Sequence, residues 1–305
     1  MIGSSVTTSM RLAITGASGQ LGSYLMDLAT GIDAVGIDLV SSPFPKHRSK
    51  IVKEDIRDLE AMRKALKGCD AVVHCAAQVS VVASIADPLN DLSHNVQGTI
   101  NLLQAAAECK VRKFVYISSA AVYGDPVRVP IDESHPLNPK SPYGTSKMAA
   151  EQYCRVFAET RGLPCVIVRP FNFYSPRADP KSPYSGVITK FVEWAKRGEP
   201  LSVDGDGEQT RDFIHAEDVA RLVLMVARSN VSNTTLNCGS GKGTSINELA
   251  KTVVKASGRK VEIKHVAPRV GDIRHSVSDM ASAKRSLGFE TEVTLAKGIR
   301  AFFGA

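Results

Sequence analysis

Five short apolar runs in the first 170 residues alternate with amphipathic segments, and this order most restricts the possible folds. The runs cover residues 11–15, 34–38, 71–75, 114–118 and 165–169. Each run is almost continuously apolar, which is typical of a strand that is buried on both faces of a sheet. Strands that alternate with helices predict a doubly wound parallel sheet in an α/β protein.

The segments between and beyond these runs predict helices. They cover residues 21–29, 59–66, 89–109, 143–160, 186–197, 216–227, 246–257 and 280–287, with a further strand at 261–265. The alternation weakens after residue 169, and no clean linker divides the chain. We therefore predict a cofactor-binding domain over residues 10–169, with contributions from about 210–240. A smaller, interleaved C-terminal substrate domain takes residues 170–209 and 241–305. Residues 1–9 predict a loose extension.

Bulk composition narrows the possible partners. The net charge of +7 is spread along 305 residues without a long basic run, so we predict no nucleic-acid partner. No apolar run approaches the ~18 residues needed to span a bilayer, which predicts no membrane partner. Six cysteines lack a Cys-x-x-Cys or zinc spacing, so we predict no metal and a reduced, cytoplasmic protein.

A glycine-rich turn joins the first strand to the first helix. Gly16, Gly19 and Gly22 follow the spacing Gly-x-x-Gly-x-x-Gly, with Gln20 and Leu21 between the last two. Glycines let the backbone approach a pyrophosphate, and the helix N-terminus offers free amides. The turn predicts a dinucleotide site on a Rossmann sheet. A plain strand-to-helix turn is the alternative.

Polar and small residues after the next strands refine this cofactor site. Asp38 ends the second strand, sixteen residues after Gly22, where a carboxylate accepts ribose hydroxyls and repels a 2′-phosphate. It therefore favours NAD over NADP. Asp55 and Ile56 are predicted to bracket the adenine, although Asp55 alone is also typical of a helix cap. The small segment Ala76, Ala77 and Gln78 follows the third strand of the five and is predicted to approach the cofactor.

Tyr143 and Lys147 form the candidate catalytic pair. Residues four apart lie on the same face of a helix, so a phenol and an ammonium share one pocket here. An ordinary tyrosine pKa is near ~10, and lowering it to about 7 requires roughly 4 kcal/mol of phenolate stabilisation. A neighbouring cation, together with an oxidised nicotinamide, is expected to supply it. The serine pair Ser118 and Ser119 lies between the glycine turn and this helix.

Taken in order, the glycine turn, Ser-Ser-x-x-x-Tyr-Gly and Tyr-x-x-x-Lys resemble the extended short-chain dehydrogenase/reductase family. Within it the chain is similar to nucleotide-sugar epimerases of the UDP-glucose or UDP-N-acetylglucosamine 4-epimerase type. Family-like blocks also occur at 95–103, 169–174, 205–215, 237–241 and 269–272, so that the resemblance covers residues 11–289.

The resemblance implies a role for each site residue. Tyr143 is the base, Lys147 lowers its pKa and holds the nicotinamide ribose, and Ser119 completes the triad. Further cofactor contacts are implied for Asn95, Ser118, Pro170 and Phe171. The substrate contacts implied by the resemblance are Ser84, Ser119, Asn172, Val187, Arg211, Arg269, Asp272 and Ser276. Arg211 and Arg269 suit a diphosphate because a guanidinium offers a planar fork of donors.

The implied reaction is a 4-epimerisation. Related 4,6-dehydratases carry two acids directly after the catalytic hydroxyl residue, whereas this chain has Ala120 and Ala121, which cannot transfer a proton. The resemblance implies that the C4 hydride passes to NAD⁺ and returns to the other face of a 4-keto sugar, with Tyr143 exchanging the proton. Two alternatives remain. One is an NAD(P)H-dependent 4-ketoreductase for a nucleotide-diphosphate sugar, and the other is a non-catalytic dinucleotide-sensing regulator.

The details of the substrate and the assembly rest on fewer residues. Asp204 occupies a position that is often aromatic in relatives and lies near the base, so uracil is an assumption. Ser276 is small where relatives restricted to glucose and galactose have bulky residues, which favours N-acetylated sugars. A homodimer is implied through the helices at 89–109 and 143–160. Their apolar residues Ile100, Leu103, Met148 and Phe157 are explained equally well by core packing.

Overall fold

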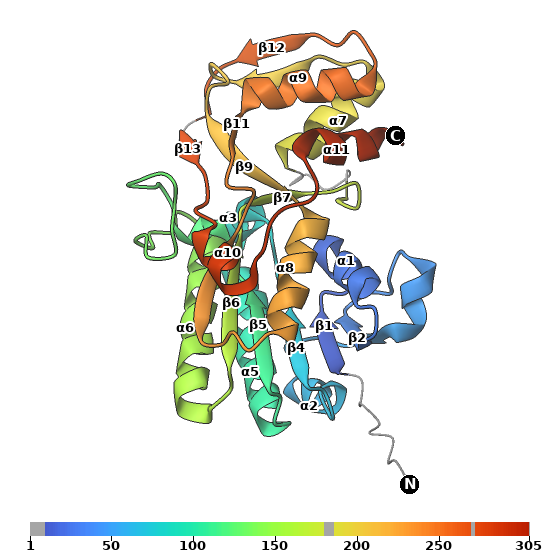
Figure 1. Ribbon diagram of the computed structural model, residues 1–305, viewed down its shortest axis with the longest axis vertical. Helices are drawn as coiled ribbons and strands as arrows, with labels where there is room; N and C mark the ends of the chain where they lie inside the picture. The colour runs from blue at the N-terminus through green and yellow to red at the C-terminus, as the bar shows by residue number, and fades with distance from the viewer. Residues whose placement is uncertain (1–9, 180–185, 270–271, 305) are drawn as a thin grey trace.

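Two blocks make up the protein in the computed structural model, which describes residues 10–179, 186–269 and 272–304. The larger block holds a parallel sheet, and the smaller one lies above the upper ends of its strands in Figure 1. The predicted extension at residues 1–9 and the centre of the 269–272 block lie outside the described residues.

The larger block is built on a seven-stranded sheet in which every neighbouring pair is parallel. The strand order is β10-β6-β5-β4-β1-β2-β3. The strands are β1 (Arg11–Thr15), β2 (Asp33–Asp38), β3 (Ile51–Lys53), β4 (Ala71–His74), β5 (Lys113–Ile117), β6 (Cys165–Pro170) and β10 (Thr234–Cys238). Strand order reverses between β1 and β4, and ligands of open α/β sheets bind beyond the carboxyl ends at such a point. The predicted doubly wound sheet is confirmed.

Helices cover both faces of this sheet, which explains why its strands are apolar on both sides. The helices α1 (Gln20–Leu28) and α8 (Ala216–Arg228) share one buried core. On the other face, α2 (Leu59–Ala65), α5 (Gly98–Glu108) and α6 (Pro142–Arg161) form the second core.

The predicted helix over 89–109 is present from Pro88 to Glu108, with a π-helical turn inside it. It consists of α4 (Pro88–Leu92), the π-helical turn at Ser93–Gln97 and α5, and the short helix α3 (Val81–Ala86) precedes it. Asp87 ends α3 and caps α4, since its side chain accepts a hydrogen bond from the amide of Asn90. The following proline cannot continue the first helix but suits the first turn of the second.

The smaller block contains two short sheets and three helices. One sheet combines β7 (Asn172–Tyr174), β9 (Thr210–His215), β11 (Gly243–Ser245) and β13 (His275–Ser276). The other pairs β8 (Leu201–Asp204) with β12 (Ile263–Val266). The helices α7 (Val187–Arg197), α9 (Ile246–Ser257) and α11 (Leu295–Arg300) pack against them around a separate core.

The chain crosses between the two blocks at other points than the predicted boundaries. Strand β9 pairs in the smaller block, although its residues fall in the predicted 210–240 contribution to the larger one. Helix α8 and strand β10 then return to the large sheet. Helix α10 (Ala281–Leu287), predicted for the smaller block, packs beside β10 and buries Ala283 in the first core of the large block.

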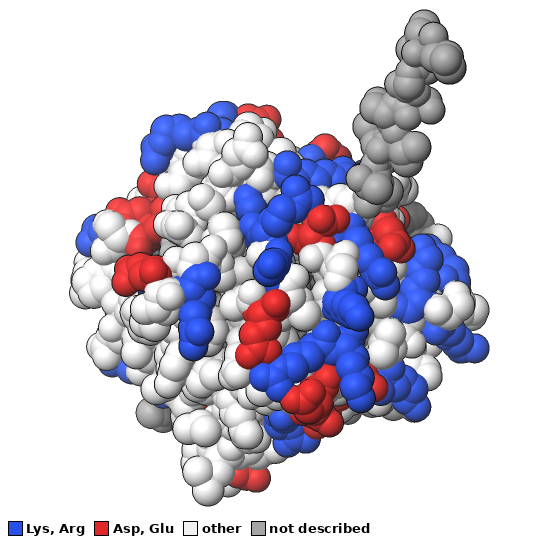
Figure 2. Space-filling view, turned by 90° about the horizontal axis from the view of Figure 1, so that it is seen from below, with Lys and Arg blue, Asp and Glu red and all other residues white. Residues whose placement is uncertain are grey.

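The surface carries mixed charge and an apolar stripe. On the face in Figure 2, basic and acidic side chains are interspersed. Ion pairs such as Arg112–Asp70 join charged side chains from distant parts of the sequence. No described helix combines the length and apolarity needed to cross a bilayer. The apolar residues predicted for a dimer pack inward instead, with Leu103 fully buried and Phe157 against the second core. The exposed apolar side chains of α3, α4 and α6 are Val81, Val82, Ile85, Leu89, Leu92, Tyr153 and Val156.

Candidate active site

The glycine turn shapes the floor of a cavity of about 540 Å³ at the strand-order reversal. Gly16 has φ +68°, and a Cβ there would lie 2.7 Å from the amide nitrogen of Ala76. A Cβ on Gly22 would collide with the carbonyl oxygen of Gly16. Only glycine lets the backbone fold back on itself at these positions, so the first turn of α1 opens directly into the cavity.

Asp38 lies in the wall of the same cavity, at the end of β2. Its carboxylate accepts hydrogen bonds from the amide of Ser18 at 2.9 Å and of Val40 at 3.2 Å. The hydroxyl of Ser18 in turn donates to the carbonyl of Val40 at 2.9 Å. These bonds tie the glycine turn to the end of β2 and fix the carboxylate at the cavity rim.

Most residues predicted to bind the cofactor line this cavity. They are Gly16, Gly19, Gln20, Leu21, Gly22, Asp38, Asp55, Ile56, Ala76, Ala77, Ser118, Tyr143 and Lys147. Four others stand outside its lining. Phe171 and Pro170 are buried in the protein, and Phe173 takes the place in the wall instead. Gln78 and Asn95 bind each other, since the Gln78 amide donates to Asn95 Oδ1 at 2.8 Å.

His74 is a packed residue. Its ring lies between the hydroxyls of Thr15, 2.7 Å from Nδ1, and Thr99, 3.0 Å from Nε2. Thr99 donates its own proton to the Asn95 carbonyl, which assigns the His74 proton to Nε2. Burial, and after it the charge of Lys147, lowers the pKa of His74 to about 3. The imidazole is therefore neutral, and its hydrogen bonds hold β1, β4 and α5 together.

The first turn of α6 holds Tyr143 through two serine hydroxyls. Ser141 caps the helix by accepting from the amide of Gly144 at 3.1 Å. Ser84 accepts from the amide of Tyr143 at 3.1 Å and donates to the carbonyl of Val81 at 2.7 Å. Ser84 is fully buried and both bonds are to the protein backbone, and its predicted substrate contact stays a prediction. It orients the candidate base through the backbone.

The electrostatics of the pair differ from the prediction. Burial raises the pKa of Tyr143, the hydrogen bond with Ser119 lowers it, and the charge of Asp91 raises it. Lys147 donates to the carbonyl of Ile117 at 2.8 Å and is not among these causes. Burial lowers the pKa of Lys147 to about 8, against the opposing effects of Cys75 and Asp91 among others. The protein groups alone therefore do not produce the predicted phenolate.

Behind the serine pair lies a buried ion pair. Ser118 donates to Glu151 Oε1 at 2.6 Å, and Arg169 reaches the two Glu151 oxygens at 2.8 and 2.6 Å. Both charged side chains are almost completely buried. Since Glu151 follows Lys147 by four residues, Tyr143, Lys147 and Glu151 occupy one face of α6. The ion pair thus fixes this face of the helix against β5 and β6.

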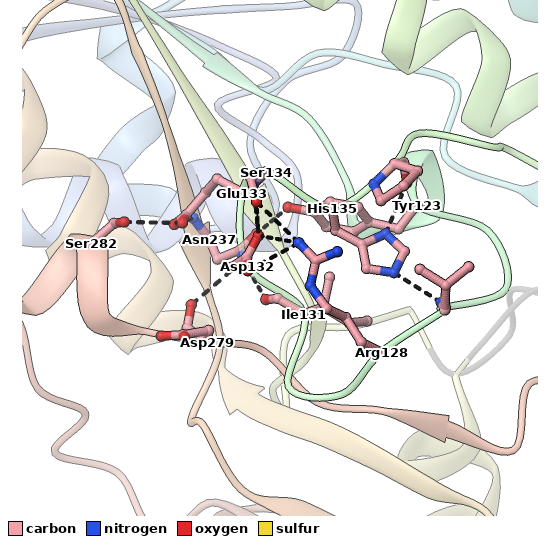
Figure 3. Close-up of polar contacts among 12 residues, drawn as sticks. Tyr123, Arg128, Ile131, Asp132, Glu133, Ser134, His135, Asn237, Asp279 and Ser282 are labelled. Atoms are coloured by element: carbon pink, nitrogen blue, oxygen red, sulfur yellow. Dashed lines mark hydrogen bonds and ion pairs between the residues drawn. The ribbon is translucent and has the colours of Figure 1, made fainter.

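The same network continues into the segment that follows Ser119. Arg169 donates to the hydroxyl of Tyr123 at 3.0 Å, which donates to Asn237 at 2.6 Å. Asn237 donates to the carbonyl of Ile131 at 2.8 Å, and its amide donates to Glu133. Figure 3 shows Glu133 reaching Ser282 on α10 as well. The loop after Ser119 is therefore braced against β10 and α10.

The small sheet brings some of the predicted substrate residues together. In β9, Arg211 pairs in register with Ser276 of β13, and Asn172 of β7 pairs with Phe213 two residues further on. The guanidinium of Arg211 contacts Asp272 at 2.5 Å. Arg269 is exposed, and its charge lowers the pKa of Arg211 after the larger effect of burial. Val187, half-buried, begins α7.

Several residues of the site are absent from the predictions made from the sequence, among them Glu151, Arg169 and Phe173. Glu151 and Arg169 form the buried ion pair, and Phe173 lines the cavity. The spacing of Glu151 from Tyr143 and Lys147 already indicates a shared helix face. Arg169 carries a weaker signal, because a charged residue that ends an apolar strand is usually exposed.

A dinucleotide fits this arrangement. The glycine cradle, the helix N-terminus and the carboxylate at the end of β2 stand where pyrophosphate and ribose are held in Rossmann proteins. Asp38 and Lys147 would hold the two riboses, and the turn from Gly16 to Gly22 the pyrophosphate. Fold and cavity together define a dinucleotide-binding α/β protein.

Comparison with known proteins gives the particular family. The chain belongs to the NAD dependent epimerase/dehydratase family, which it matches over residues 12–239. As a member, it is an NAD-dependent enzyme. It is 37% identical to the UDP-glucose 4-epimerase of Mycolicibacterium smegmatis over 303 residues, which cover 95% of this chain and 96% of the relative.

Two solved structures share the fold over their whole length. One is a UDP-glucose 4-epimerase with UDP-glucose from Thermotoga maritima, with a TM-score of 0.90 and 34% identity over 97% of this chain and 99% of that chain. The other is a UDP-N-acetylglucosamine 4-epimerase from Methanobrevibacter ruminantium M1 in complex with UDP-N-acetylmuramic acid. It has a TM-score of 0.91 and 32% identity over 97% and 99% of the two chains.

Proposed function

We propose that this protein is a UDP-sugar 4-epimerase that keeps NAD bound between turnovers. The observation that carries the proposal is that Tyr143 and Lys147, one helical turn apart on α6, both line the cofactor cavity. The residues after Ser119 are alanines, so no second acid stands there to eliminate water. The epimerase names of the relatives support the same reaction.

The proton chemistry belongs to Tyr143. Bound NAD supplies a hydride acceptor and donor at the sugar carbon C4. Tyr143 takes the C4 hydroxyl proton and returns it after the sugar has turned, while Ser119 hydrogen-bonds to the same oxygen. The positive charge of the bound cofactor would oppose the effect of burial, which raises the pKa of Tyr143 in the protein alone.

The anchors for the nucleotide lie in the smaller block. Arg211 and Arg269 are near enough for one charge to affect the other, and two guanidinium groups neutralise a diphosphate. Arg211 pairs with Asp272, and in the proposed complex a phosphate takes the place of this carboxylate. Asn172 lies on β7, the strand that pairs with β9, opposite Phe213. A sugar that turns within its pocket requires such a firm hold on the diphosphate.

Ser276 supports a wider sugar range. It is half-buried and pairs in register with Arg211, beside the proposed diphosphate site. A small side chain here leaves room for an N-acetyl group, so we propose UDP-N-acetylglucosamine as well as UDP-glucose. Replacing Ser276 with Tyr would fill that space, and the variant should lose activity on the N-acetylated sugar while it retains activity on UDP-glucose.

The decisive experiment is incubation with UDP-glucose and UDP-N-acetylglucosamine separately, without added cofactor. The expected result is the C4-inverted product, seen by chromatography or NMR, and about one NAD released per chain on denaturation. Turnover that requires added NAD(P)H would support the ketoreductase alternative. Bound NAD with no product from any nucleotide sugar would support the regulator, although the intact Ser119, Tyr143 and Lys147 speak against it.

We also propose that the enzyme is a cytoplasmic homodimer. Ile85 is 64% exposed, Leu89 76% and Val156 48%, and they lie on α3, α4 and α6, which contact one another. A second copy would bury this stripe. All six cysteines are free, which suits a reducing compartment. Light scattering of Leu89→Lys against the parent tests the dimer, and an unchanged mass would refute this interface.

A further inference from the structure

Asp91, in α4, is a fully buried carboxylate with only one oxygen in use. Its Oδ1 accepts hydrogen bonds from Gln78 Nε2 at 2.9 Å and Asn95 Nδ2 at 3.0 Å. Its Oδ2 has no hydrogen-bond partner among the described residues, and no described cation forms an ion pair with it. A buried charge without a partner is costly, so the position calls for a specific role.

The surroundings of Asp91 connect it to the catalytic helix. Helix α4 packs against α6. The side-chain amide of Asn95, which donates to Asp91, also donates to Ser146 at 3.1 Å, one residue before Lys147. The Asp91 charge accordingly acts on both members of the pair. After the larger effect of burial, it raises the pKa of Tyr143 and opposes the lowering of the pKa of Lys147.

The other ionisable groups that face the pair are either joined in ion pairs or uncharged. Glu151 and its partners Arg169 and Arg155 form a closed ion-pair cluster. His74 is neutral because burial lowers its pKa to about 3. Burial raises the pKa of Cys75 to about 12.

Two further groups contact this region. Burial also raises the pKa of Cys154 and of Tyr116 well above their usual values. Both therefore stay uncharged near neutral pH. Among the described residues whose charge acts on Lys147, Asp91 is the one carboxylate without an arginine beside it.

We propose that Asp91 is a positioning residue that holds a negative charge against the Tyr143–Lys147 turn and so sets the pH range in which the pair works. This rests on the proposed function of the pair. A negative charge favours the neutral phenol over the phenolate and the ammonium over the amine. It therefore moves both proton equilibria in the same direction, which gives the proposal a distinctive signature.

The test is the pH profile of kcat/KM for Asp91→Asn with UDP-glucose. Asparagine preserves the shape and the acceptor oxygen but removes the charge. Both limbs of the profile should move to lower pH by about one unit, the acidic limb through Tyr143 and the alkaline limb through Lys147. A purely structural role would lower activity and leave both limbs in place, which would overturn the proposal.

A second measurement needs no turnover. The ultraviolet absorbance of tyrosinate is titrated in the parent and in Tyr143→Phe, and the difference reports Tyr143 alone. The same difference measured in the Asp91→Asn background should be shifted to lower pH by about one unit. An unshifted difference contradicts the inference. If the parent converts no UDP-sugar, the proposed function fails while this titration still decides the role of Asp91.

Matched variants separate charge from packing. Asp218, in the distant helix α8, is another fully buried carboxylate, and it accepts hydrogen bonds from the amides of Glu292 and Val293. The variant Asp218→Asn removes this carboxylate. It should lose stability without moving either limb. Asp91→Glu keeps the charge and should also leave the limbs in place. If Asp91→Asn does not fold, Asp91→Ser serves for the same titration, and an unmoved Tyr143 there overturns the proposal equally.

Discussion

The catalytic face of α6 and the substrate sheet around β9 both carry charged residues, but they hold them in opposite ways. At α6, Glu151 is 0% exposed and is joined to Arg169, Arg155 and Ser118. At β9, the side chains of Arg211 and Asp272 are 15% and 31% exposed and contact each other. The Glu151–Arg169 pair is enclosed, whereas the Arg211–Asp272 pair is partly open to solvent.

Physical chemistry gives this difference a meaning. A buried ion pair is expensive to break because it leaves a charge without water or partner. A partly exposed pair contributes about 0–1 kcal/mol and is easily replaced. The larger block thus holds its charged groups in a fixed frame, while the smaller block holds a pair that can change partner, as the proposed function requires.

The largest expected effect falls on the fixed frame. Tyr143→Phe keeps the ring but removes the hydroxyl that exchanges the C4 proton. We expect kcat to fall by roughly 10³-fold, within the range of general acid–base catalysis. Turnover is measured with UDP-glucose, and bound NAD should remain, because the ring still lines the cavity. A variant that keeps full turnover would remove Tyr143 from the mechanism.

Breaking the buried ion pair should have the next largest effect, this time on stability. Arg169→Met leaves Glu151 buried with less compensation and should cost about 3–5 kcal/mol in the free energy of unfolding. Urea denaturation measures it. The double variant Arg169→Met/Glu151→Leu removes both charges and should recover much of the loss. A single variant as stable as the parent would show that the two regions hold their charges alike.

A substitution of Arg211 tests the same contrast in the smaller block. Arg211→Met should leave the free energy of unfolding within about 1 kcal/mol of the parent, because the lost ion pair is partly exposed. The KM for UDP-glucose should rise by roughly 30-fold, which corresponds to about 2 kcal/mol of a charge-assisted contact. Asp272→Asn frees the guanidinium and should not raise KM. A fall in kcat alone would contradict the binding role.

The same contrast explains what can be predicted from the sequence. The strands of the large sheet are continuous apolar runs, and β1 matches its predicted bounds while β5 and β6 differ by one residue. The strands around β9 are two to six residues long, carry polar residues and pair with distant segments. Neither period nor composition marks such strands, since their partners define them.

Residue roles follow the same division. The glycine turn can be predicted from the spacing of its glycines, because the close backbone contacts at this turn admit only glycine. Its residues line the cavity as predicted. Ser84 was predicted to bind substrate, but its hydroxyl accepts a hydrogen bond from the amide of Tyr143, 59 residues away. No sequence pattern marks Asp91 as a site residue, because a carboxylate on a polar helix is typical of a solvent-exposed face. Only the packing of α4 on α6 reveals it.

The smallest expected effect comes from a matched pair of helix caps, one in each region. Ser141 caps α6 and Ser245 caps α9, and each side chain accepts an amide hydrogen bond at 3.1 Å. Replacing either serine with alanine should cost about 1 kcal/mol of stability, measured by urea denaturation. Only Ser141→Ala loosens the turn that carries Tyr143, so kcat should fall several-fold there, whereas Ser245→Ala should keep the parental kcat. Equal kcat values in the two variants would mean that the catalytic turn does not depend on its cap, and that Ser84 alone holds Tyr143 in place.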